Sequence, residues 1–177
     1  MPQSDASTFI PLLFARVDSQ RVAFYIHEVA EVVLRPELQE WPRELEVVDG
    51  VFNLEGSWLP VFSIGKLLRL PVSELGNFDP LIISKEAPRI AFRVDELEKV
   101  DKVHWDRIKP WETSVEQSLA MAARVEDEEE PAWLISISQL LTTQEQELAV
   151  FISDSTEQRE RDSALELERL RQEVSSS

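Results

Sequence analysis

The stretch that decides the fold is residues 48–62, which read VDGVFNLEGSWLPVF. Valine, phenylalanine and tryptophan make both halves of this stretch prone to form strands, and Glu55-Gly56-Ser57 between them is a turn signal. The pattern therefore predicts a β-hairpin with strands over 47–54 and 58–62. Residues 63–70 follow with apolar side chains at helical spacing and end before Pro71, which predicts one short helix.

Strand patterns of the same kind occur on both sides of this hairpin. They cover residues 9–17, 21–26, 81–84, 89–94, 119–125 and 133–137. Residues 27–33 are expected to make one helical turn that leads into a further strand, which Pro36 ends.

The alternation over 89–94 predicts that Phe92 points inward, between an outward Ala91 and an outward Arg93. Short strands at regular spacing with turn signals between them predict an all-β barrel. Two halves that are poor in helix predict two such barrels.

The last part of the chain has a different pattern. Ser155 and Gln158 have the spacing of a capping box, which predicts the start of a helix. An apolar stripe at intervals of three and four follows, made by Ala164, Leu167, Leu170 and Val174. This amphipathic helix could pack on its own barrel, fray in solvent or bind a partner, and the sequence leaves these alternatives open. We expect a flexible leader over 1–8, a domain of two sub-barrels over 9–141 and a charge-rich helical extension over 142–177.

The net charge of −16 limits the kinds of molecule that the chain is expected to bind. Nucleic acids and anionic membrane surfaces attract basic proteins, so we expect neither as a partner and expect other proteins instead. The run 126–130 (EDEEE) is expected to be a solvated turn.

No apolar run approaches the ~20 residues that span a bilayer, which predicts no direct membrane insertion. The lack of cysteine and of a visible secretion signal suits the cytoplasm.

Candidate catalytic and metal-binding groups are few. His27 and Glu31 are four residues apart, but a zinc site of this kind needs a second histidine at position 31, and the only other histidine is His104. Asp49 and Asp95 adjoin predicted strands, where aspartates usually serve turns. The four glycines are scattered and form no phosphate-binding loop. We therefore predict no catalytic residue, no metal site and no cofactor, and keep an enzyme of unknown type only as a distant alternative.

Residues 48–62 resemble the signature hairpin of CheW-type coupling domains, with its pattern of Gly, apolar, x, Asn, Leu, Arg, Gly, three residues, Pro and Val. The short helix after the hairpin, the VAEV segment at 29–32, the strand at 90–95 and the segment 133–141 follow the order of the same family. The resemblance covers about residues 9–141.

This resemblance implies a mainly β, CheW-like fold of two small five-stranded SH3-like barrels, with short helices and the C-terminal amphipathic helix. It also implies a non-catalytic adaptor of bacterial chemosensory signalling. The implied partners are the cytoplasmic tip of a methyl-accepting chemoreceptor, the regulatory domain of a CheA-type histidine kinase, and further CheW-like domains. Such an adaptor would be cytoplasmic and recruited to membrane-associated receptor arrays. The alternative is a divergent CheW-like module for other partners, for example in pilus motility or in localising a complex.

Five residues fall at positions of receptor or kinase contact in the family: Val29, Glu31, Gly50, Asn53 and Gly56. Each also has a purely structural interpretation, because Val29 could belong to the core, the glycines could serve turns and Asn53 could bond to nearby backbone.

One position departs from the family pattern, since Glu55 stands where the family has arginine. Reversing a charge at an interface can cost several kcal/mol, so this departure predicts a specialised or divergent member: either its partner has co-adapted, or it does not couple the usual receptor to the usual kinase.

Overall fold

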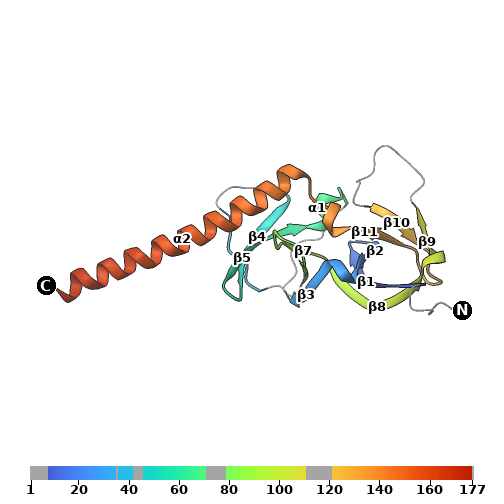
Figure 1. The fold of residues 1–177 in the computed structure, drawn as a ribbon, viewed down its shortest axis with the longest axis horizontal. Helices are drawn as coiled ribbons and strands as arrows, with labels where there is room; N and C mark the ends of the chain where they lie inside the picture. Colours follow the sequence, from blue (N-terminus) through green and yellow to red (C-terminus); the bar gives the residue numbers. More distant parts are fainter. Residues whose placement is uncertain (1–7, 35, 42–45, 71–78, 111–120, 177) are drawn as a thin grey trace, which may run out of the picture.

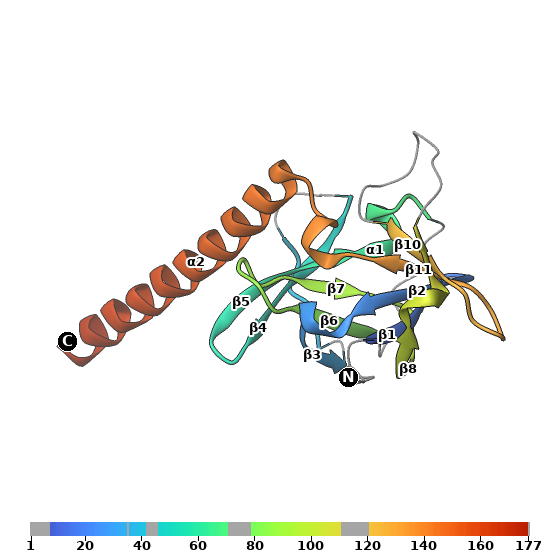
Figure 2. The same ribbon diagram turned by 45° about the vertical axis from the view of Figure 1, so that its right-hand side comes forward.

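The computed structural model describes residues 8–34, 36–41, 46–70, 79–110 and 121–176. Its strands form two barrel-like sheets (Figures 1 and 2). The first sheet has the strand order β8 (Glu96–His104), β1 (Phe9–Val17), β2 (Gln20–Tyr25), β11 (Ala132–Ile135), β10 (Met121–Val125) and β9 (Ile108–Pro110). The second has the order β3 (Val29–Leu34), β6 (Pro80–Ser84), β7 (Ala91–Arg93), β5 (Ser57–Ser63) and β4 (Val48–Leu54). The predicted mainly β, CheW-like architecture is confirmed, with a sixth short strand in the first sheet.

The hairpin of β4 and β5 forms where the sequence predicts it. Leu54 pairs with Ser57, so the loop consists of Glu55 and Gly56 alone. Their φ angles are 51° and 93°, and two consecutive positive φ angles are the geometry of a two-residue turn that fits the twist of the strands.

Short helices connect several strands. They are η2 (Ile26–Glu28), α1 (Ile64–Leu67), η3 (Trp105–Arg107) and η4 (Ile137–Gln139). The predicted helical turn before β3 and the predicted short helix after β5 are both present. The hydroxyl oxygen of Ser63 caps α1 by accepting a hydrogen bond from the backbone N–H of Lys66 at 3.3 Å.

Three apolar clusters make the core, and the largest lies between the two sheets. Val22 and Phe24 of β2 belong to this central core, whereas Ala23 belongs to the core of the first barrel. Strand β7 has the same two-sided character, because Phe92 faces the central core and Ala91 faces the core of the second barrel.

The predicted outward orientation of Ala91 and Arg93 is therefore wrong. Ala91 is fully buried and only 3% of Arg93 is exposed. One face of β7 packs on the central core through Phe92 and the other on the core of the second barrel through Ala91, so both of its faces are covered.

Helix α2 (Thr143–Ser175) runs without interruption for 33 residues, about 50 Å, and its C-terminal end projects beyond the barrels (Figure 1). Its N-cap is Thr142, which forms a reciprocal capping box with Glu145. The predicted start at Ser155 is wrong, because Ala149 and Ile152 are already helical and fully buried against the domain. The predicted leader falls mainly on residues 1–7, outside the described part of the chain.

Substituting Ile152 with alanine tests whether the first half of α2 is an integral part of the fold. Ile152 is completely buried, so Ile152→Ala should lower the free energy of unfolding by about 2–5 kcal/mol. Val150 lies on the exposed side of the same turn, and Val150→Ala should change this free energy by less than about 0.5 kcal/mol. Urea denaturation measures both, and equal effects of the two substitutions would show that α2 is only loosely attached.

Candidate protein-docking site between the barrels

A groove of about 200 Å³ opens between the two barrels. Its floor is apolar and is made by Ile90, Phe92, Ile137 and Leu141, which come from the two sides of the central core. Glu86 stands at its rim and is exposed. A concave apolar surface with a few polar groups at its edge is typical of a binding site for an apolar side chain.

Glu28, at the end of η2, holds the walls of this groove together. Its carboxylate accepts hydrogen bonds from the hydroxyl of Ser136 at 3.0 Å and from the backbone N–H of Ile137. Its backbone carbonyl accepts a hydrogen bond from the N–H of Lys85 at 2.9 Å. One residue thus joins η4 to the loop that precedes β7. Local sequence patterns carry no signal for these contacts, because Lys85 lies 57 residues from Glu28 and Ser136 and Ile137 lie more than a hundred residues from it.

Val29 and Glu31 lie beside the groove, on β3. Val29 pairs with Ser84, a residue that lines the groove, and its half-buried side chain packs against the central core. Glu31 is exposed and its carboxylate lies 3.4 Å from the guanidinium of Arg89. Of the five predicted site residues, the structure brings these two together next to the groove.

Gly50, Asn53 and Gly56 lie elsewhere, on the β4–β5 hairpin. Strands β3 and β4 are the two ends of the strand order of this sheet, and none of the three residues lines the groove. The side-chain oxygen of Asn53 accepts a hydrogen bond from the N–H of Gly56 at 2.8 Å, which stabilises the turn. A Cβ atom on Gly50 would lie 2.8 Å from the carbonyl oxygen of Gln39, so only glycine fits there.

The residues considered for a metal site have other contacts. The ring of His27 lies 5.2 Å from the ring of Tyr25, and Glu31 faces Arg89. Within the described residues, no group of three or more histidine or carboxylate side chains could hold a metal ion.

A buried cation, Arg93 on β7, lies close to three carboxylates. Its guanidinium lies 2.7 Å from the carboxylate of Asp49 and 3.6 Å from those of Asp79 and Asp95. Asp49 was expected to serve a turn, and that prediction is wrong, since its side chain is only 3% exposed and is paired with Arg93. Asp95 does serve a turn, because it accepts a hydrogen bond from the backbone N–H of Asp18 between β1 and β2.

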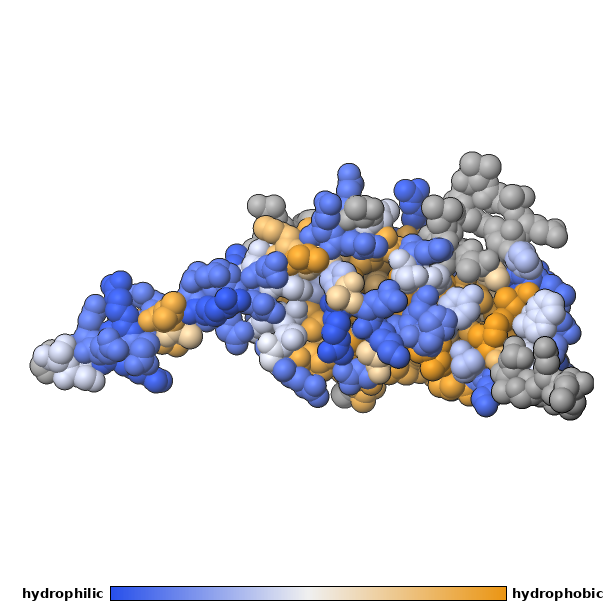
Figure 3. Space-filling view, in the orientation of Figure 1, coloured by the Kyte–Doolittle hydropathy of each residue, from blue (hydrophilic) through white to orange (hydrophobic). Residues whose placement is uncertain are grey.

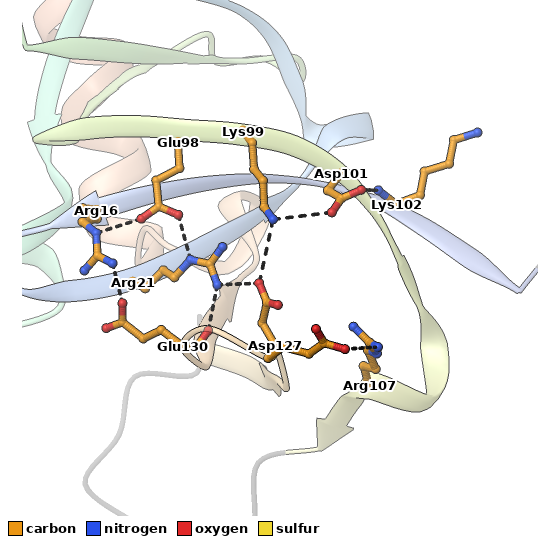
Figure 4. Close-up of polar contacts among 10 residues, drawn as sticks. Arg16, Arg21, Glu98, Lys99, Asp101, Lys102, Arg107, Asp127 and Glu130 are labelled. Carbon is orange, nitrogen blue, oxygen red and sulfur yellow. Dashed lines mark hydrogen bonds and ion pairs between the residues drawn. The ribbon is translucent and has the colours of Figure 1, made fainter.

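A second buried cation, Arg21, anchors the acidic run of the first barrel (Figure 4). It donates hydrogen bonds to the carboxylates of Glu98 at 2.8 Å and Asp127 at 2.7 Å, and to the backbone oxygen of Glu130 at 2.7 Å. Its guanidinium also lies 4.5 Å from the centre of the Phe14 ring. The run 126–130 was expected to be solvated, and this holds only in part, because Asp127 and Glu130 are half-buried on Arg21 while the other three residues are exposed.

The contact between Arg21 and Asp127 shifts the pKa of both side chains. The hydrogen bond from Arg21 lowers the pKa of Asp127 below its ordinary value. Burial alone would lower the pKa of Arg21, but the hydrogen bonds with Asp127 and Glu98 outweigh it, so that the pKa is raised.

Comparison with known proteins agrees with the fold. Residues 11–145 match the family model of the CheW-like domain. The chain belongs to this family. The CheW-like domain family is one of non-catalytic scaffolds and adaptors, and at the level of the family the chain is classed with them.

Two individual CheW proteins are similar to the chain. The chemotaxis protein CheW of Thermotoga maritima is 24% identical over 94 residues, which cover 53% of this chain and 62% of that relative. The chain thus matches less than two thirds of that relative's length. The crystal structure of the scaffolding protein TtCheW from Thermoanaerobacter tengcongensis has the same fold, with a TM-score of 0.66 at 18% identity, over 72% of this chain and 88% of that one.

The CheW-like match ends at residue 145, close to the start of α2, so most of this helix lies beyond it. Among the described helices, none is both long and apolar enough to cross a membrane.

The Asp127–Arg21 contact predicts a dependence of stability on pH. Because the pKa of Asp127 is lower in the folded chain, its contribution is fully present above the unfolded value of about 3.9 and is lost as the pH falls through the folded value. Asp127→Asn should therefore lower the free energy of unfolding by about 1–3 kcal/mol at neutral pH, and the difference from wild type should shrink in acid.

Denaturation at several pH values measures this difference. Glu129→Gln is the matched control, since Glu129 lies in the same loop but is exposed, and it should show little effect at any pH. A difference for Asp127→Asn that stays constant from neutral to strongly acidic pH would contradict the role given to this carboxylate.

Proposed function

We propose that the chain is a chemosensory adaptor that couples the cytoplasmic tip of a chemoreceptor to a CheA-type histidine kinase. The observation that carries this proposal is the apolar groove built jointly by the two barrels of a CheW-like domain. We further propose that the adaptor works in the cytoplasm, recruited to membrane-associated receptor arrays.

The groove fits the receptor side of this role. A helical receptor tip presents apolar side chains at intervals of three and four, and such a stripe can lie in an apolar groove. Ile90, Phe92 and Leu141 provide apolar surface for it, and Glu86 at the rim can pair with a basic residue of the tip. Val29 and Glu31 lie beside the groove, where they would contact the same helix.

The β4–β5 hairpin is our candidate for the second contact, with the kinase regulatory domain or with another CheW-like domain. It carries Gly50, Asn53 and Gly56, and it is separate from the groove, so both partners could bind at once. The backbone of this hairpin is held rigidly by its turn and by the hydrogen bonds between Val51 and Gln39 at 2.8 and 2.9 Å. A preformed surface binds with a smaller loss of conformational entropy.

Glu55 supports a second candidate, a CheW-like module with partners other than the usual receptor and kinase. This residue is exposed at the tip of the hairpin, where the family pattern has arginine. A partner adapted to arginine would meet a charge of the wrong sign, at a cost of several kcal/mol. Outputs such as pilus motility or localisation of a complex fall under this candidate.

Blocking the groove tests the proposal. Ser138 is exposed at its edge, so Ser138→Trp should fill the groove and weaken binding of a chemoreceptor tip fragment from the same organism by about ten-fold or more. Binding of the kinase regulatory domain should not change. Ser19→Trp places the same side chain on the exposed β1–β2 turn, away from the groove, and should leave both affinities unchanged.

Titration of purified components measures these affinities. Equal binding of the tip by Ser138→Trp and wild type would contradict the groove assignment. Binding of neither component by the wild-type chain would contradict receptor–kinase coupling and favour the second candidate.

A further inference from the structure

The projecting half of α2 carries a stripe of apolar side chains that are largely exposed. Leu167, Leu170 and Val174 are 59%, 45% and 75% exposed, and their spacing of three and four places them on one side of the helix. We call these three residues the α2 stripe. In the space-filling view, an apolar patch interrupts the hydrophilic surface of the projecting helix (Figure 3). The stripe lies beyond residue 145, where the CheW-like match ends.

The α2 stripe continues the side of the helix that is seated on the barrel. Ile152 and Thr156 are buried, and Glu160, one turn further, accepts a hydrogen bond from the indole N–H of Trp58 on β5. Ser163 lines the hollow between α2 and this barrel. Steps of three and four residues connect these positions to the stripe, so the stripe faces the same way after the barrel has ended.

Aromatic contacts fix the direction in which the helix projects. The ring of Trp41 packs edge-on against Phe151 with 6.2 Å between the ring centres, and the guanidinium of Arg159 lies 5.6 Å from the centre of the Trp41 ring. The stripe is therefore presented at a defined place next to the second barrel.

A second copy of this chain does not fit the stripe. In a parallel pair the helix of the copy would run along the side of α2 on which Ile152 and Thr156 are already packed against the barrel. In an antiparallel pair with the stripe as its seam, Glu166 and Glu173 occupy the flanking positions that face their own equivalents. Steric overlap opposes the first arrangement and charge repulsion the second.

The charges beside the stripe indicate the chemistry of the occupant. Glu166 and Glu173 flank it on one side and Arg171 on the other. Residues 157–175 carry six acidic and four basic side chains, so acidic groups outnumber basic ones both beside the stripe and along this half of the helix. Arg169 lies 3.9 Å from Glu166 and 3.4 Å from Glu173, but all three side chains are more than half exposed. Such exposed pairs are weak, so the two carboxylates remain available to a partner's cations.

We propose that the projecting half of α2 is a docking site for a basic amphipathic helix of a partner protein. The apolar side chains of that helix pack on Leu167, Leu170 and Val174, and its lysine or arginine residues pair with Glu166 and Glu173. This site is separate from the groove between the barrels, and it gives the adaptor a contact that the matched CheW-like segment does not contain.

Synthetic helical peptides test this proposal on the full chain. The probe has three heptads with leucine at positions a and d and lysine at e and g, and the comparison peptide has glutamate in place of every lysine. Fluorescence anisotropy should show that wild type binds the lysine peptide about ten-fold or more tightly than the glutamate peptide. Leu167→Ala with Leu170→Ala should weaken binding of the lysine peptide by about ten-fold or more, whereas Leu165→Ala, on the opposite side of the helix, should not. Alanine favours helix, so both variants should keep the helix content seen by circular dichroism.

Charge reversal separates docking at the stripe from general attraction to an acidic protein. Glu166→Lys with Glu173→Lys should shift the preference toward the glutamate peptide, and Glu147→Lys with Glu168→Lys, an equal change of net charge away from the stripe, should not. Equal peptide binding by the stripe variant and wild type would overturn the proposal, as would an unchanged preference after charge reversal. A wild-type dimer in sedimentation equilibrium that is lost in the stripe variant would also overturn it, because the occupant would then be a second copy.

Discussion

The two barrels share one apolar core, and the structure depends on the two strands that bound it. Strand β2 directs Phe24 into this core and Ala23 into the first barrel, and β7 directs Phe92 into it and Ala91 into the second. A strand that is buried on both faces cannot move without exposing one of its faces to water, at about 25 cal/mol per Å² of apolar surface. The relative position of the barrels is therefore fixed, and with it the groove that lies between them.

Buried charges then determine which loops lie against each barrel. Arg21 draws the acidic run inward through Asp127, and Arg93 links β7 to Asp49 on β4. Removing one partner of such a pair leaves an unpaired buried charge, which is far costlier than the net gain from forming the pair. Glu28 acts in the same way at the groove, because it joins η4, just before α2, to the second barrel. An adaptor with preformed surfaces follows from these contacts, since neither barrel has to rearrange before it binds.

Local sequence patterns predicted the β4–β5 hairpin and the alternation on β2, because each depends on neighbouring residues. The two-barrel architecture was predicted from the number and spacing of the strand patterns, although its sheets contain pairs of distant strands such as β2 with β11. Patterns could not predict that Ala91 and Arg93 are buried, since alternation does not reveal whether a second layer covers the outer face of a strand. The start of α2 was misplaced for a similar reason. Capping-box spacing occurs at Ser155 and at Thr142; the structure forms the box at Thr142, and the packing of Ala149 and Ile152 on the domain stabilises the helical turns before Ser155.

The candidate site was predictable only in part. Family resemblance pointed to Val29 and Glu31, which lie beside the groove, whereas Glu28 was missed because its partners are distant in the sequence.

Hydrogen exchange of the full chain, with and without the chemoreceptor tip fragment, tests the central claim most directly. We predict that the tip slows exchange in 85–92 and 137–141, on the two walls of the groove, and leaves the hairpin tip at 53–57 unchanged. Slower exchange at the hairpin tip with no change in either wall would contradict the account.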